Sequence, residues 1–202
     1  MKKLNLIRHG EVVKPQEMIL TGSIDLPLTG FGRDQIKNTA KYLEVSSAAA
    51  IFCSPLLRAR QSAEILFHNK KAKVLPKLSE IDFGEWENQS LHKILKTHPE
   101  EIKKWENDFE NFAFPAGESV KDFIERISHL ANFFFSLKEK EIFVVTHKGV
   151  ITFLICHFLG ISYQKYLSFH VDTASHSVLT LYEKDAALSA LNIQYHKNDH
   201  EK

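Results

Sequence analysis

The chain has 202 residues, with 26 Lys and Arg against 25 Asp and Glu and a formal net charge of +1. At 44% hydrophobic and 25% charged residues, it is long and apolar enough to bury one sizeable core. The charge balance excludes a global field that would attract nucleic acid or an anionic membrane, so any anion site must be local.

The cysteines and the apolar segments indicate where the protein works. Cys53 and Cys156 lie in apolar stretches without metal-binding spacing, which predicts two buried, reduced thiols. The apolar run after "MKK" is too short for a secretion signal, and residues 150–160 are too few to span a membrane. We therefore expect a cytoplasmic protein without a membrane segment.

The first half of the chain alternates predicted strands and helices. The predicted strands are residues 3–7, 48–54 and 72–76. A helix is predicted over residues 29–44, with Thr29 as its N-cap. A second helix is predicted to start with Ser54 as N-cap and Pro55 at the first helical position.

The second half continues this alternation after a polar helical segment. Residues 91–111, interrupted by Pro99, predict a helical excursion from the core that spans about residues 88–115. The elements predicted beyond it are an amphipathic helix at 120–134, a strand at 141–147, an apolar helix at 150–159 ended by Gly160, and strands at 177–183 and 190–196.

The early strands are apolar throughout, as in sheets that are buried on both faces. Strands that alternate with helices predict a layered α/β fold. We therefore expect a single domain over residues 1–202, a three-layer α/β/α sandwich with a largely parallel central sheet.

Reactive side chains stand where the predicted strands end, which is where open α/β sheets form their sites. Arg8 and His9 follow the first strand, and His147 ends the strand at 141–147. Arg58 lies in the first turn of a helix, where a cation opposes the helix dipole unless an anion lies at the helix start. These positions predict one anion site.

A fourth group is the stretch "LSEIDFGEWEN", in which Glu80 and Asp82 stand among apolar and aromatic residues. A carboxyl group beside such a surface can act as a general acid near neutrality. A charged loop with aromatic anchors is the other interpretation of this stretch.

Together these groups suit phosphoryl transfer. Guanidinium groups match phosphate oxygens and neutralise their charge. An imidazole that nearby arginines keep neutral is a good nucleophile, and a second imidazole can donate to the phosphoryl group. A carboxylic acid can protonate the departing alkoxide and later deprotonate water. This inventory predicts a phosphohistidine mechanism with no metal and no cofactor.

The assembled motifs resemble those of the histidine phosphatase superfamily, also called phosphoglycerate mutase-like. The matching segments, in order, are "LIRHGE" (6–11), "DLPLTGFG" (25–32), "CSPLLRARQSAEIL" (53–66), "SEIDFGEWE" (79–87), "PAGES" (115–119) and "VVTHKGVI" (144–151). The resemblance covers nearly the whole chain. It implies His9 as the phosphorylated nucleophile and Glu80 as the proton donor. The phosphate-binding residues that it implies are Arg8, Arg58, His147, Thr21 and Gly22.

Within the superfamily, "FGEWE" and the ending "LGISYQKYLSFHVDTASHSVLTL" are most similar to the alpha-ribazole phosphatases. That similarity implies a small phosphomonoester substrate, alpha-ribazole 5′-phosphate, in the assembly of the lower ligand of cobalamin.

Four positions depart from the family's pattern. Val12 and Pro15 stand where many members have Thr and Asn, and the lost Asn removes a phosphate donor. Asn88 and Lys148 each replace a glycine. Lys148 could add charge at the mouth of the pocket or could be an exposed surface lysine.

Other functions fit the same residues. A broad-specificity phosphatase or a phosphoglycerate mutase-type phosphotransferase would use the same phosphohistidine. A metallohydrolase would use His9, His147, Glu80 and Asp82, and a non-catalytic phosphate-binding module is the remaining class. The pattern leaves open the oligomeric state and whether residues 91–111 form a lid.

Overall fold

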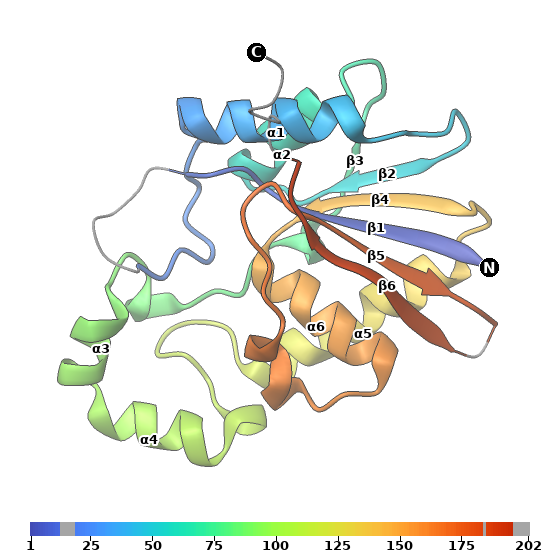
Figure 1. Cartoon of the computed structure of the whole chain (residues 1–202). Coiled ribbons are helices and arrows are strands. Elements are labelled where there is room, and N and C mark those ends of the chain that lie inside the picture. Colours follow the sequence, from blue (N-terminus) through green and yellow to red (C-terminus); the bar gives the residue numbers. More distant parts are fainter. Residues whose placement is uncertain (13–18, 184, 196–202) are drawn as a thin grey trace.

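The centre of the protein is a mixed β-sheet, seen in a computed structural model that describes residues 1–12, 19–183 and 185–195 (Figure 1). Within these residues six strands pair in the order β3-β2-β4-β1-β5-β6. They are β1 (Lys2–Arg8), β2 (Ala50–Cys53), β3 (Lys73–Val74), β4 (Glu141–Thr146), β5 (His176–Leu181) and β6 (Ala186–Ile193). The pairs among β3, β2, β4 and β1 are parallel, and β5 and β6 add antiparallel.

Helices cover both faces of this sheet, which confirms the predicted three-layer sandwich. One face carries α1 (Gly30–Tyr42) and α2 (Leu57–Leu66), and the other carries α5 (Val120–Ser136) and α6 (Lys148–Leu159) (Figure 1). Strand β1 shows why both faces are covered. Its Leu4 and Leu6 pack on the α5–α6 side, whereas Ile7 packs on the α1–α2 side.

Helix α5 forms where the amphipathic pattern predicts it. Ser119 is the N-cap, and its hydroxyl accepts a hydrogen bond from the backbone N–H of Asp122 at 3.0 Å. One face of the helix is buried, through Val120, Phe123, Ile127, Leu130, Ala131 and Phe134. Burying each of the larger side chains contributes about 1.5–3 kcal/mol, so this face rather than helix propensity holds α5 in place.

Helix α6 is the apolar helix that the sequence predicts, and it begins two residues earlier, at Lys148. It ends where predicted, at Gly160, whose φ of 63° is the left-handed conformation that glycine adopts without strain.

The part of the chain between β3 and α5 folds as short helices. Pro99 begins α4 (Pro99–Asn107), and His98 separates it from α3 (Leu91–Thr97). Three-residue 3-10 helices flank the pair: η1 (Pro76–Leu78), η2 (Gly84–Trp86) and η3 (Phe109–Asn111). In Figure 1 α3 and α4 lie beside the sheet rather than on either face. Their Ile94 and Ile102 nevertheless join the same buried cluster as β1 and α5, together with the fully buried Trp86.

The predicted start of α2 is wrong. The helix begins at Leu57, so Pro55 lies ahead of it and Ser54 is not its N-cap. The Ser54 hydroxyl is already engaged, because it hydrogen-bonds to the His147 ring at 2.7 Å. The carboxylate of Asp25 accepts from the first N–H of the helix instead.

The last strand is also displaced from its predicted range of residues 190–196. A 2.8 Å hydrogen bond from the N–H of Tyr182 to the carbonyl of Asp185 joins the chain on the two sides of residue 184, directly after β5. Strand β6 therefore begins at Ala186 and ends at Ile193, and residue 196 lies outside the described residues.

Both cysteines are buried and free, as predicted, and burial raises the pKa of each thiol to about 11. In the described part of the chain no helix is long and apolar enough to cross a membrane.

We expect Ser119→Ala to lower the free energy of unfolding by about 1 kcal/mol, because it removes the N-cap of α5. Ser128→Ala, in the middle of the same helix, is the control, and it should change stability by less than about 0.5 kcal/mol. Urea unfolding of the two variants and the parent protein measures this difference. Equal effects of the two substitutions would contradict the capping role.

Candidate active site

Parallel pairing of β1 with β4 brings two histidines together. Arg8 lies opposite Thr146 in the register, and the N–H of His9 donates to the carbonyl of Thr146 at 3.0 Å. The residue that follows β4 is His147, so both imidazoles leave the carboxyl end of the sheet side by side. Their ring centroids lie 5.1 Å apart.

The hydrogen bond of His9 fixes the state of its ring. Nδ1 lies 2.7 Å from the carbonyl oxygen of Gly10, and a carbonyl can only accept, so Nδ1 carries the proton. Burial, followed by the charges of Arg8 and Arg58, lowers the pKa of His9 well below 6.5. The ring is therefore neutral at pH 7, and the lone pair on its Nε2 is free.

His147 is held from both sides of its ring. The Nε of Arg58 donates to Nδ1 at 3.2 Å, so Nε2 carries the proton and donates to the hydroxyl of Ser54 at 2.7 Å. His147 is fully buried, and this burial, followed by the closeness of the His9 ring and the charge of Arg58, lowers its pKa well below 6.5. The sequence predicts Ser54 only as a helix N-cap, although it follows β2 as His147 follows β4.

Arg58 is buried in a cradle of backbone carbonyls. It donates to Ile24 at 2.6 Å and to Gly22 at 2.7 Å, with a longer contact to Thr21 at 3.4 Å. Burial lowers its pKa, and nearby carboxylates, Asp25 among them, oppose this. The anion expected at the start of this helix is thus, in this structure, the carboxylate of Asp25.

Arg8 keeps one donor free. Its Nη1 donates to the carbonyl of Val171 at 2.8 Å, whereas its buried Nε has no hydrogen-bond partner in the part of the chain that the structure describes. Burial lowers the pKa of Arg8 most, and the charges of Glu80 and Asp172 oppose it. A buried guanidinium N–H without a partner, beside two imidazoles, is suited to an anionic ligand.

Glu80 lies at the start of α6. Its carboxylate accepts from the N–H of Gly149 at 3.0 Å and from that of Ile81 at 3.1 Å. A Cβ at position 149 would lie 2.4 Å from the carboxylate, so only glycine permits this approach. The charge of Glu80 opposes the lowering of the pKa of Arg8 and of Arg58, so its carboxylate lies near both guanidinium groups.

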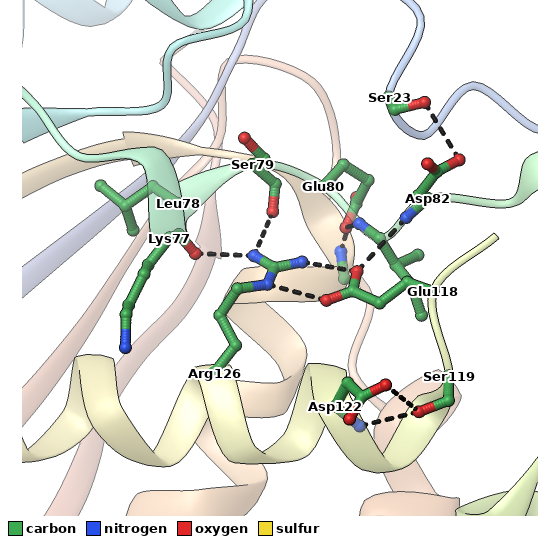
Figure 2. Close-up of polar contacts among 12 residues, drawn as sticks. Ser23, Lys77, Leu78, Ser79, Glu80, Asp82, Glu118, Ser119, Asp122 and Arg126 are labelled. Carbon is green, nitrogen blue, oxygen red and sulfur yellow. Dashed lines mark hydrogen bonds and ion pairs between the residues drawn. The ribbon is translucent and has the colours of Figure 1, made fainter. Parts of the chain in front are cut away.

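Asp82, the other carboxylate of this stretch, joins two loops. Its Oδ1 accepts from the hydroxyl of Ser23 at 3.1 Å (Figure 2). The same oxygen accepts from the N–H of Gly84 at 2.9 Å. Among residues 1–12, 19–183 and 185–195, no three His, Cys, Asp or Glu side chains are grouped so that they could hold a metal ion.

Thr21 and Gly22 lie beside Arg58, which their carbonyls hold. The N–H of Gly22 donates to the carboxylate of Glu87 at 3.0 Å, and that of Ser23 does so at 2.6 Å. A Cβ on Gly22 would lie 2.0 Å from the carbonyl of Ile81, so the two loops approach closely here. Glu87, which the sequence analysis did not single out, ties this loop to the one that carries Glu80.

The positions that depart from the family's pattern have different surroundings. Val12 forms an isolated bridge with Leu28, and Pro15 lies outside the described residues. Asn88 has a φ of 58°, a left-handed conformation that Asn tolerates better than other side chains.

Lys148 is half-buried rather than an exposed surface lysine. Burial and then the charge of Arg8 lower its pKa, and Asp172 and Glu80 oppose them, so its ammonium group lies near the site. This ammonium has no hydrogen-bond partner among the residues that the structure describes. It therefore adds a second cation near Arg8.

Comparisons with known proteins show the family to which the chain belongs. Residues 4–194 match the family model for the histidine phosphatase superfamily (branch 1). The adenosylcobalamin/alpha-ribazole phosphatase of Escherichia coli (strain K12) is 30% identical over 196 residues, which covers 94% of this chain and 95% of that protein. Phosphoserine phosphatase 1 of Hydrogenobacter thermophilus is 28% identical over 202 residues, with 97% and 94% covered.

A solved structure agrees as well. That of a putative alpha-ribazole-5′-P phosphatase from Escherichia coli matches with a TM-score of 0.86 at 28% identity, and the match covers 98% of this chain and 99% of that one. The chain belongs to the histidine phosphatase superfamily, and it is a phosphatase. The resemblance inferred from the sequence motifs is thereby confirmed.

Acid is expected to destabilise this fold through its buried neutral histidines. Unfolded histidine binds a proton near pH 6.5, whereas folded His9 and His147 do not. The unfolded state then holds more protons, so the free energy of unfolding falls below that pH by about 1.4 kcal/mol per pH unit for each histidine. Urea unfolding at pH 7.5 and 5.5 measures the change.

His9→Gln should remove one histidine's share of this pH dependence, and replacement of the exposed His129 should leave it intact. An equal pH dependence in the parent protein and His9→Gln would contradict the assignment of a neutral, buried His9.

Proposed function

We propose that the protein is a metal-independent phosphomonoester hydrolase in which His9 is the nucleophile, and that it acts on alpha-ribazole 5′-phosphate. The hydrogen bond from Nδ1 of His9 to the carbonyl of Gly10 carries the mechanism, because it leaves the Nε2 lone pair free in a neutral ring. The similarity to the Escherichia coli alpha-ribazole phosphatase supports the substrate.

In the first step Nε2 of His9 attacks phosphorus, so an N–P bond forms while the P–O bond to the alcohol breaks. Arg8 and Arg58 neutralise the charge on the phosphoryl oxygens, with the free Nε of Arg8 as a ready donor. His147 donates its Nε2 proton to Ser54 in this structure, so it can bind a phosphoryl oxygen only when that oxygen replaces Ser54 as the acceptor.

Glu80 moves the protons in both steps. As a carboxylic acid it gives its proton to the departing alkoxide, and the alcohol leaves. As a carboxylate it then takes a proton from water, which attacks phosphorus and breaks the N–P bond. Inorganic phosphate leaves, and both His9 and Glu80 return to their starting states. A mutase would place a second substrate hydroxyl where this mechanism places water.

Phosphate release in EDTA tests the chemistry and the substrate together. We expect EDTA to leave the release from alpha-ribazole 5′-phosphate unchanged, and His9→Asn to lower kcat at least about a thousandfold, as loss of a nucleophile does. His129→Gln, at an exposed position, is the matched control and should keep full activity. Phosphoserine and 3-phosphoglycerate, assayed alongside, should be poorer substrates by kcat/KM.

Activity lost in EDTA, or retained in His9→Asn, would contradict the mechanism. A higher kcat/KM for either comparison substrate would contradict alpha-ribazole 5′-phosphate as the substrate while leaving the mechanism in place.

Lys148 favours phosphoserine as a second candidate substrate. The half-buried ammonium lies near Arg8 without a hydrogen-bond partner in the described residues, and phosphoserine carries a carboxylate that could meet it. The phosphoserine phosphatase of Hydrogenobacter thermophilus is almost as similar to this chain as the alpha-ribazole phosphatase is.

Lys148→Ala distinguishes the two candidates. If phosphoserine is the substrate, the variant should raise its KM about tenfold or more, because a charge-assisted hydrogen bond is lost. The KM for alpha-ribazole 5′-phosphate, which has no carboxylate, should rise much less. Lys121→Ala, at an exposed site on α5, is the control. An unchanged KM for phosphoserine would contradict this candidate.

A further inference from the structure

Glu80 stands in a stretch of backbone without helix or strand. Residues 79–83 connect η1 to η2, so no ladder of backbone hydrogen bonds fixes them. The place of the Glu80 carboxylate therefore depends on the side chains that hold this stretch. Figure 2 shows that most of these contacts converge on Arg126 and Glu118.

On the side before Glu80, three successive carbonyls are held. The Nη1 of Arg126 donates to the carbonyls of Lys77 at 2.6 Å and Ser79 at 2.7 Å (Figure 2). The carbonyl between them, that of Leu78, accepts from the hydroxyl of Thr146 at 2.7 Å, at the end of β4. The backbone leading to Glu80 is thus tied to α5 and to the end of β4, directly before His147.

On the side after Glu80, the same ion pair holds the chain again. The N–H of Glu118 donates to the carbonyl of Asp82 at 2.9 Å, and the N–H of Asp82 lies 3.4 Å from the Glu118 carboxylate. That carboxylate accepts from Nε of Arg126 at 2.9 Å and from Nη2 at 2.8 Å. Arg126 and Glu118 therefore hydrogen-bond to the backbone on both sides of Glu80.

The pair is itself well fixed. The guanidinium of Arg126 lies over the ring of Phe123, one turn earlier on α5, at 4.6 Å from its centroid. The side chains of Arg126 and Glu118 are only 17% and 19% exposed, so water screens their ion pair little. Two parallel N–H···O bonds also set the orientation of the carboxylate, which a single contact would not do.

We propose that Arg126 and Glu118 are positioning residues for the proton transfer by Glu80, an inference that rests on the proposed function of Glu80 as the acid. They touch neither the substrate nor the reacting atoms. They hold the Glu80 carboxylate where the leaving oxygen departs, and a misplacement of about 1 Å can cost about a hundredfold in rate. Loss of the pair therefore acts on the step that needs a proton.

Loss of the positive charge of Arg126 is an alternative cause of a lower rate, because that charge also contributes to the lowered pKa of His147. Arg126→Lys separates the two causes. Lysine keeps the positive charge, but it cannot reproduce the planar fork that joins Glu118 and two carbonyls.

The leaving group reports on the proton transfer. Phosphoserine has a poor alkoxide leaving group, whereas p-nitrophenyl phosphate has an activated one that departs without a proton. We expect Arg126→Gln to lower kcat/KM about a hundredfold for phosphoserine and less than about threefold for p-nitrophenyl phosphate. Arg126→Lys should retain a selective loss of about tenfold or more. Lys121→Gln removes an exposed cation of the same helix and should change neither.

A double substitution sharpens the test. Once Glu80→Gln has removed the acid, Arg126→Gln should cost less than about threefold more with phosphoserine, because residues that act as a unit are not additive. Additive losses, equal losses with both substrates, or full recovery in Arg126→Lys would overturn the proposal. If Arg126→Gln does not fold by circular dichroism, Glu118→Gln carries the same comparison.

The single variant Glu80→Gln distinguishes a failure of the proposed function from a failure of this inference. If it slows both substrates equally, the acid role in the proposed function fails, and this inference fails with it. If Glu80→Gln is selective for phosphoserine and Arg126→Gln is not, only this inference fails.

Discussion

The parallel pairing of β1 with β4 is the constraint on which the site depends. Because Arg8 lies opposite Thr146, the next residues, His9 and His147, leave the sheet side by side. Side chains alternate along a strand, so a shift of one residue in this register would send the two imidazoles to opposite faces. The pairing of the apolar strands β1 and β4 in the core therefore determines which side chains meet at the end of the sheet.

Burial then decides the state of each charged group. Burial excludes water from both imidazoles and lowers their pKa values, so they stay neutral. The charges of the adjacent guanidinium groups lower these pKa values further. The arginines themselves are costly to bury, and carbonyls and carboxylates around them offset that cost. In a chain with a net charge of only +1, the positive potential is concentrated in one place by the fold rather than by composition.

The sequence predicted the elements whose signals are local. Ser119 marks the start of α5 and Gly160 the end of α6, because capping depends on residues within one turn. The strand-end rule likewise predicted Arg8, His9 and His147, since the carboxyl ends of parallel strands share one edge.

The contacts that cross long stretches of chain were not predictable in this way. Ser54 has the local pattern of an N-cap, yet its hydroxyl binds a ring 93 positions further on. Arg126 looks like one more cation on an amphipathic helix, and its partner carbonyls, at Lys77 and Ser79, lie in a loop that no periodicity describes. Tertiary partners decide such roles, and local propensity does not report them.

The nature of the covalent intermediate tests the account most directly. The protein would be mixed rapidly with p-nitrophenyl phosphate, quenched in alkali and digested, and the phosphorylated peptide would be located by mass spectrometry. The account predicts a phosphoryl group that is stable in alkali, labile in acid and carried by the peptide that contains His9. Phosphate on a different side chain, or turnover with no phosphoenzyme at any time after mixing, would contradict it.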